Sequence, residues 1–198
     1  MKPPYIAFAA AFTLTACGPL VQIGGNARAP EALLTLTATA AAPAPGGPAR
    51  SADTIAVEIP AVPAVLQTLR LPVTTSASEV RYLAGASWAE QPARQFQRVL
   101  ADTLAGAGLA VIDTHQAGIA PARSLTGTLR VFGLDVSGAP QVRVRYDAQI
   151  AAPRGSSVAL RRFEAAEPVS NQTPVAVAAA LNRAANRVAA DVAAWATP

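Results

Sequence analysis

Within residues 142–151, apolar and polar side chains alternate strictly as far as Ile150, and this pattern limits the folds open to the chain more than any other stretch. A repeat of two residues is typical of a β-strand, because successive side chains point to opposite faces of a sheet. The apolar positions are Val142, Val144, Tyr146, Ala148 and Ile150, and the polar positions are Arg143, Arg145, Asp147 and Gln149. The segment therefore predicts a strand with one buried face and one face in water.

Neighbouring segments extend this strand into an antiparallel meander. Apolar stretches at 125–136 and 158–165 flank it, and turn-forming residues at 137–140 and 153–156 join the three. Five shorter stretches upstream predict further strands, of which the second is expected to be half-buried. These are 33–37, 55–59, 69–73, 79–83 and 109–112.

Two other segments have the helical period. Between residues 89 and 106 the apolar side chains recur on one face. Two starts fit this helix: either Ser87 and Glu90 form a capping box, or Pro92 stands in the first turn. A second helix begins at Thr173, and its apolar stripe predicts that it closes over the sheet. The first stripe is Phe96, Val99, Leu100, Thr103 and Leu104, and the second is Ala178, Leu181, Ala185, Val188, Val192 and Trp195.

These elements predict one α/β domain of the α+β kind over residues 31–198, with a mixed, mostly antiparallel sheet packed by two main helices. The chain has 198 residues, of which 52% are hydrophobic, and this is enough for one sizeable core. A tract rich in Pro, Ala and Gly at 40–52 has no period and predicts a loop. Cys17 is the only cysteine, so the core must supply the stability that an internal disulfide would otherwise add.

The N-terminal residues predict export. The stretch 5–14 carries no charge and is shorter than the about 20 apolar residues of a membrane span. Its length suits the core of a signal peptide, which is roughly 7–15 residues. It runs into Leu14-Thr15-Ala16-Cys17, which has the form of a bacterial lipobox.

A lipobox is cleaved before its cysteine, so we expect a signal peptide at 1–16 and cleavage between Ala16 and Cys17. The thiol of Cys17 would carry the lipid, and residues 17–30 would form a flexible tether. Lys2 is the only charged side chain before the apolar stretch. A plain cleaved signal or an uncleaved anchor therefore remains as an alternative.

Residues for catalysis or metal binding are scarce. The single histidine, His115, follows Asp113 by two positions, but a hydrolase needs a nucleophile beside its base, and the sequence has no Gly-x-Ser-x-Gly motif. One histidine and one lipidated cysteine cannot complete a zinc site. No calcium loop and no phosphate-binding Gly-Lys-Ser/Thr loop is present. The sequence therefore predicts a protein that is not an enzyme and takes no cofactor or metal.

The basic residues are dispersed. The formal net charge is +4 and aromatic residues make up 5% of the chain, which argues against a nucleic-acid groove. Arg143 and Arg145 share the polar face of their strand, and Arg130, Arg161 and Arg162 lie on neighbouring strands. Together they predict a cationic face that contacts anionic lipid or an acidic partner. The alternative is a sheet face that is simply solvated.

Three aromatic residues, Tyr82, Trp88 and Phe96, surround the start of the first helix. Large rings at such a position commonly pack in the core, where they supply apolar area. A groove for a lipid acyl chain is the alternative interpretation.

Two stretches, 59–73 and 80–96, together resemble the ABC-type transport auxiliary lipoprotein family. The first is a proline- and leucine-containing segment that runs into a strand, and the second has a Tyr followed by a Trp-Ala-Glu-x-Pro-like helix start. The positions that carry the resemblance are Pro63, Leu66, Tyr82, Trp88, Glu90 and Pro92. The resemblance extends from about Leu33 to Trp195.

The resemblance implies a periplasmic lipoprotein without catalytic residues. Its partners would be a permease, an ATPase and a mammalian-cell-entry domain protein, a set that moves lipids between the inner and outer membranes. Phospholipid is a further expected contact, and the acyl anchor on Cys17 would hold the chain to a membrane. Gly18 stands where inner-membrane lipoproteins commonly carry aspartate, so the outer membrane is expected rather than the inner one.

Two other functions remain open from the sequence. A structural or assembly lipoprotein of the envelope would share the anchor and the fold, but would bind an outer-membrane protein or peptidoglycan. A periplasmic hydrolase is a more distant alternative, because it would depend on His115 alone.

Overall fold

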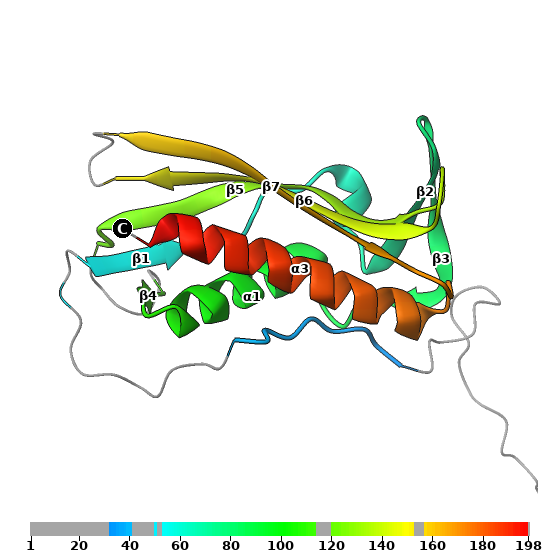
Figure 1. Cartoon of the computed structure of the whole chain (residues 1–198), viewed down its shortest axis with the longest axis horizontal. Helices are drawn as coiled ribbons and strands as arrows, with labels where there is room; N and C mark the ends of the chain where they lie inside the picture. The colour runs from blue at the N-terminus through cyan, green and yellow to red at the C-terminus, as the bar shows by residue number, and fades with distance from the viewer. Residues whose placement is uncertain (1–31, 41–49, 51–52, 114–119, 153–156, 198) are drawn as a thin grey trace, which may run out of the picture.

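The structure is a computed structural model, and it describes residues 32–40, 50, 53–113, 120–152 and 157–197. In this part of the chain, seven strands form one sheet and two long helices pack against one of its faces (Figure 1). The predicted α/β domain with a mixed, mostly antiparallel sheet and two main helices is confirmed. The elements are β1 (Thr54–Val57), the short 3-10 helix η2 (Ala64–Leu66), β2 (Arg70–Ser76), β3 (Glu79–Ser87), α1 (Pro92–Gly106), β4 (Ala110–Ile112), β5 (Arg123–Asp135), β6 (Gln141–Ala151), β7 (Val158–Pro168) and α3 (Pro174–Ala196).

Strand β5 organises the sheet because it pairs directly with three other strands, β1, β2 and β6. Along one edge it pairs with β6 in antiparallel fashion, and β6 pairs with β7 in the same way. The other edge is shared by two parallel neighbours: β1 pairs near the start of β5 and β2 near its end. Strands β4 and β3 extend the sheet beyond β1 and β2. The meander predicted from the alternating sequence is the β5–β6–β7 half of this sheet.

The core lies between the sheet and the helices. Val142, Val144 and Tyr146 of β6 are fully buried, as the alternation predicts. The ring of Phe96 from α1 meets that of Tyr146 edge-on, with the ring centroids 5.4 Å apart. Helix α3 places its predicted stripe against β6 and β7, and Leu181 is among its fully buried residues. The helix therefore closes over the sheet as expected.

The start of α1 follows the proline interpretation. Pro92 is the first helical residue, and Gln91 precedes it without a side-chain cap. The capping-box interpretation is wrong, because the Glu90 carboxylate pairs instead with Arg98. Helix α3 is capped at its start by Thr173, whose hydroxyl accepts a hydrogen bond from the backbone N–H of Ala176.

The prediction of a half-buried strand at 55–59 is wrong in two respects. Strand β1 spans Thr54–Val57 and has no exposed face, because all four of its residues are buried. It lies inside the sheet, with β4 paired to one edge and β5 to the other. Ile59 lies beyond the strand and is 48% exposed. Strand β3 is longer than the predicted 79–83 and reaches Ser87.

Residues 34–39 form a strap across the two helices in place of the predicted strand at 33–37 (Figure 1). Only one bridge, between Leu34 and Trp88, connects the strap to a neighbouring backbone in the manner of a sheet. Side chains of the two helices accept hydrogen bonds from three of its backbone N–H groups, and Nδ2 of Asn186 donates to the carbonyl of Thr37 at 2.8 Å. Gln95 Oε1 accepts from Leu36 N at 2.7 Å, Asn182 Oδ1 from Thr37 N at 2.9 Å, and Asn186 Oδ1 from Thr39 N at 2.7 Å. The alternating apolar residues Leu34 and Leu36 are buried against the helices, which explains the strand-like sequence pattern.

Candidate functional site

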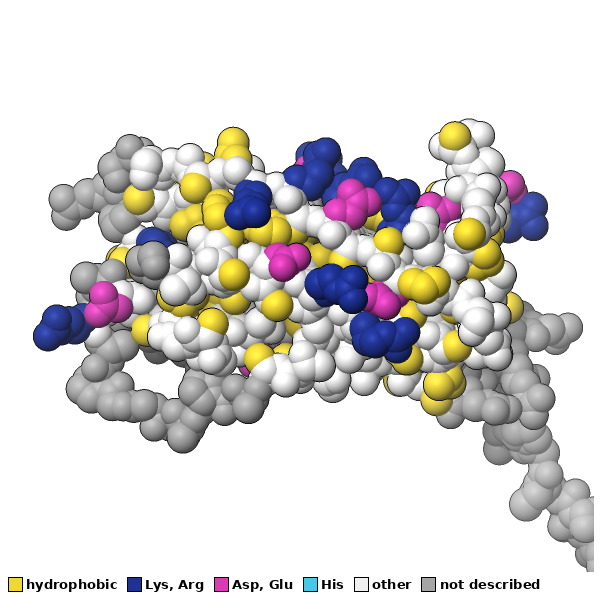
Figure 2. Space-filling model, viewed as in Figure 1, with side chains coloured by type: hydrophobic (Ala, Val, Ile, Leu, Met, Phe, Trp, Pro, Cys, Tyr) yellow, Lys and Arg dark blue, Asp and Glu magenta, His cyan; other side chains and the backbone are white. Residues whose placement is uncertain are grey.

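The sheet face opposite the helices, which we call the outer face, carries a ladder of alternating arginines and carboxylates. They come from the polar positions of β5, β6 and β7, which the register brings side by side. Basic and acidic side chains intermingle over these strands along the upper part of Figure 2. A period-two strand whose opposite face is buried must present its polar residues here.

One half of the ladder is built around Glu164 of β7. Arg145 donates to its carboxylate through Nε and a terminal nitrogen, at 2.9 and 3.0 Å. Arg143 donates to Glu164 at 2.6 Å and to Asp135 at 3.3 Å. The hydrogen bonds from Arg145 and Arg143 lower the pKa of Glu164. The pKa of Asp135 is lowered as well, chiefly by the hydroxyl of Ser137.

The other half is built around Asp147 of β6. Arg162 donates to both oxygens of this carboxylate, at 2.6 and 2.9 Å, and Arg130 donates to one of them at 3.0 Å. These partners lower the pKa of Asp147 to about 2, with the hydrogen bond from Arg162 the largest cause. The carboxylate therefore stays ionised through the physiological range.

The ladder is close to electroneutral. Four arginines, at 130, 143, 145 and 162, share three carboxylates, at 135, 147 and 164, which leaves one surplus positive charge. Arg161 does not belong to the ladder, because it lies over the ring of Phe163, 5.2 Å from the centroid. The contact face predicted at Arg143 and Arg145 remains a prediction, but most of its charge is already paired.

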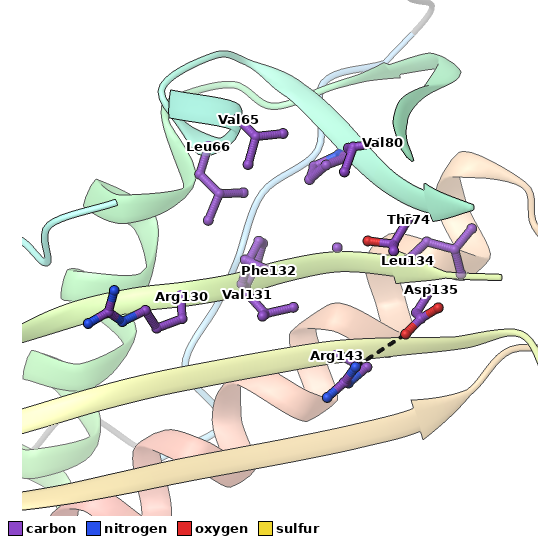
Figure 3. A pocket seen from close by; sticks show the side chains of 12 residues that line it. Val65, Leu66, Thr74, Val80, Arg130, Val131, Phe132, Leu134, Asp135 and Arg143 are labelled. Atoms are coloured by element: carbon purple, nitrogen blue, oxygen red, sulfur yellow. Dashed lines mark hydrogen bonds and ion pairs between the residues drawn. The ribbon is translucent and has the colours of Figure 1, made fainter. Parts of the chain in front are cut away.

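An apolar groove opens on the outer face beside the ladder. Its volume is about 270 Å³, and η2, β2, β3 and β5 contribute to its walls. Figure 3 shows Val65, Val80 and Val131 around the groove, with Arg130 at one end and the Arg143–Asp135 pair at the other. Gly133 allows β2 to approach closely here, because a Cβ at this position would lie 2.5 Å from the carbonyl oxygen of Pro72. No local sequence pattern marks the groove.

Some of the residues that carry the family resemblance are buried at the junction between sheet and helix. Trp88 is fully buried and its ring lies 5.6 Å from that of Phe132. Leu66 and Pro92 are buried too, whereas Pro63 is exposed and only precedes η2.

The three aromatic residues around the helix start do not share one environment. Trp88 and Phe96 are fully buried in the core, in agreement with the packing interpretation. Tyr82 is half-exposed on β3, where the guanidinium of Arg70 lies 4.0 Å from its ring centroid. The apolar groove lies on the outer face of the sheet, and none of these three rings lines it.

Several predicted site residues lie outside the described residues: Ala16, Cys17 and His115. Within the described ranges, no group of three or more His, Cys, Asp or Glu side chains is arranged to hold a metal ion. In the same part of the chain, neither helix has the length and apolar character needed to cross a bilayer.

Comparison with solved structures identifies the fold. The crystal structure of protein XCC0632 from Xanthomonas campestris, of the DUF330 family, aligns with a TM-score of 0.70 at 23% sequence identity, over 83% of this chain and 93% of that one. The crystal structure of an uncharacterised protein aligns with a TM-score of 0.62 at 17% identity, over 72% and 90% of the two chains. At these identities the likeness concerns the fold alone.

Comparison with protein families identifies the family. A search of curated proteins gave no match. The family model described as ABC-type transport auxiliary lipoprotein component matches residues 34–193, from the strap to the last turns of α3. This match covers every strand and helix of the domain except the last three residues of α3, and it agrees with the resemblance seen around Trp88. The chain therefore belongs to the ABC-type transport auxiliary lipoprotein component family.

Proposed function

We propose that this protein is a non-enzymatic accessory of a mammalian-cell-entry-linked ABC system that moves lipids between the inner and outer membranes. Membership of the family makes it an auxiliary lipoprotein of ABC-type transport located in the envelope. Its proposed partners are the permease, the ATPase and the mammalian-cell-entry protein of that system. Its task is to bind and position them, and phospholipid is the transported molecule.

The observation that carries this proposal is the family match across the whole described domain. The architecture supports it, because the described residues offer two well-packed layers and an open sheet face instead of a deep, catalytically equipped cleft. The outer-face groove is open and measures about 270 Å³, slightly below the roughly 300–1,000 Å³ of pockets that enclose small molecules. Such a surface is suited to contact with another protein.

The proposed anchor is a lipid on Cys17, with residues 1–16 removed as the signal peptide and 17–30 serving as the tether. Leu34 follows Cys17 by seventeen positions, so the strap begins no more than roughly 60 Å from the acyl chains. The strap, which follows the proposed tether in the sequence, is bonded to α1 and α3. We place the anchor in the outer membrane because Gly18 replaces the aspartate that commonly retains lipoproteins at the inner membrane.

Affinity isolation from gently solubilised membranes tests this function. The full chain with a C-terminal tag is compared with Cys17→Ala, which cannot be lipidated, and with Thr15→Ser, which keeps a small residue in the lipobox and serves as the matched control. Labelled palmitate fed to the same cells reports lipidation, and membrane fractionation reports the location.

We expect the wild type and Thr15→Ser to incorporate palmitate, to sediment with the outer membrane and to co-isolate with the permease, the ATPase and the mammalian-cell-entry protein. Cys17→Ala should lose the label and most of the bound transporter. Recovery of an outer-membrane protein or of cell-wall fragments, without a transporter subunit, would instead indicate a structural lipoprotein of the envelope.

A further inference from the structure

A bulge in β5 places a cation and an apolar side chain next to each other at the outer-face groove. The pairing register of β5 with β6 shifts by one residue between Leu129 and Val131, and Arg130 is the extra residue. Bulges insert one residue into a strand and redirect the neighbouring side chains. As a result, Arg130 and Val131 both line the groove although they are consecutive in sequence.

Arg130 differs from the other ladder arginines in how little of its guanidinium is engaged. Its Nε donates to Asp147 at 3.0 Å, whereas Arg145 and Arg162 each donate to a carboxylate through two nitrogens. Within the described part of the chain, the two terminal nitrogens of Arg130 have no acceptor, and its side chain is 58% exposed. Because Arg162 already pairs with Asp147, the surplus charge of the ladder lies at this position.

The unoccupied donors of Arg130 match the shape of a carboxylate. A guanidinium can bind both oxygens of a carboxylate through two parallel N–H groups, and this geometry makes arginine frequent at protein interfaces. A second carboxylate at Arg130 would restore the balance of four arginines with four acids. The site therefore favours an anionic group over a neutral or cationic one.

The groove beside Arg130 has room for an apolar side chain. Its volume of about 270 Å³ is open to solvent on one side, so it cannot bury most of a two-chain lipid. Its exposed rim includes Val80, which is 48% exposed on β3, and a small aliphatic pocket of this kind is typical of the centre of a protein interface.

We infer that the outer face is a docking site for a segment of a partner protein that presents one apolar side chain next to an aspartate or glutamate. The apolar side chain occupies the groove between Val65, Val80 and Val131, and the carboxylate binds the terminal nitrogens of Arg130. This inference deepens the proposed function and rests on it for the identity of the partner as a subunit of the transport system.

Site-specific photo-crosslinking in living cells tests the docking site on the full, lipidated chain. Val80 is replaced by p-benzoylphenylalanine, the cells are irradiated, and the cross-linked residue is identified by peptide mass spectrometry. Val175, which is 73% exposed on α3, is the matched control position. A second arm adds Arg130→Glu, with Arg94→Glu as the control because Arg94 is an exposed arginine of α1.

We expect Val80, but not Val175, to yield a cross-link to one protein segment that carries an aspartate or glutamate close to the cross-linked residue. Arg130→Glu should lower the yield at least about tenfold, because like charges then face each other. Arg94→Glu should leave it unchanged, and replacing the mapped acid by arginine should restore the yield in Arg130→Glu. A cross-link to lipid, no cross-link above the Val175 level, or no effect of Arg130→Glu would overturn the docking site.

The identity of the cross-linked protein separates the two proposals. A transporter subunit at the site would support both of them. A protein outside the transport system, cross-linked in the same Arg130-dependent way, would support the docking site and contradict the proposed function.

Discussion

Replacing Gly127 by alanine should destabilise the protein more than any other single-methyl change that we consider. Gly127 lies in β5 opposite Ala148 of β6. A Cβ at this position would stand 2.3 Å from the carbonyl oxygen of Asp147 and 2.7 Å from the nearest ring atom of Tyr146. The Tyr146 ring is fully buried, and its hydroxyl donates to the carbonyl of Thr126 at 2.9 Å.

The loss of stability in Gly127→Ala depends on which atoms have to move to make room for the new Cβ. The oxygen of Asp147 belongs to the backbone, so a side-chain rotation cannot relieve the contact, and overpacking of this kind costs about 1–3 kcal/mol. A displaced Tyr146 ring would also weaken its hydrogen bond, for about a further 1 kcal/mol. We therefore expect Gly127→Ala to lower the free energy of unfolding by about 3 kcal/mol, which is a large share of the roughly 5–15 kcal/mol of a typical domain.

Urea unfolding of the Cys17→Ala chain, followed by circular dichroism, measures this effect against two matched glycines. Gly138→Ala meets nothing within 4 Å and has no unusual φ, so it should change the stability by less than about 0.5 kcal/mol. Gly85→Ala also meets open space but has a φ of 71°, so it should cost about 1 kcal/mol of backbone strain. If Gly127→Ala unfolds at the same urea concentration as Gly138→Ala, the close packing of β5 on Tyr146 is refuted.

Three further outcomes follow from single contacts. Because the pKa of Asp147 is lowered to about 2 in the fold, its ion pairs should stabilise the protein by about 1 kcal/mol above about pH 4, after solvent screening. This stabilisation should be lost as the pH falls toward 2. Asp147→Asn should abolish that part of the pH dependence of urea unfolding. Arg123→Met removes the 2.6 Å hydrogen bond to the Ala196 carbonyl and should speed amide exchange in the last turn of α3. Asn186→Ala removes the hydrogen bonds to Thr37 and Thr39, and should lower the free energy of unfolding by about 1–2 kcal/mol and expose the strap to protease. An unchanged rate of cleavage would show that the apolar contacts alone hold the strap in place.

Elements whose sequence pattern matches their burial could be predicted. The period of two in β6 and of 3.6 in α1 and α3 reflects one buried face each, and the structure buries the same faces. The alternation at 55–59 predicts an exposed face that includes Ala56, but alanine is small and apolar, and Ala56 is buried in the structure. The strap was predicted as a strand because Leu34 and Leu36 alternate with polar residues, while the helix amides that bond it lie far along the chain.

The candidate site was less accessible from the sequence. The alternation placed Arg143 and Arg145 on the solvent face, but their partner Glu164 depends on the register of β7, which a sequence without the fold does not specify. The groove joins η2 and strands that are distant in sequence, so no local motif indicates it.

The central claim, that the chain assists lipid movement between the two membranes, is tested most directly by the transfer of radiolabelled phospholipid in intact cells. Cells that lack the protein are compared with cells that contain the wild type, Cys17→Ala or Arg94→Glu, and the labelled lipid in each membrane is followed after a pulse. The account predicts that transfer slows in the absence of the protein and with Cys17→Ala, and is normal with the wild type and Arg94→Glu. An equal rate of transfer in all four strains would contradict it.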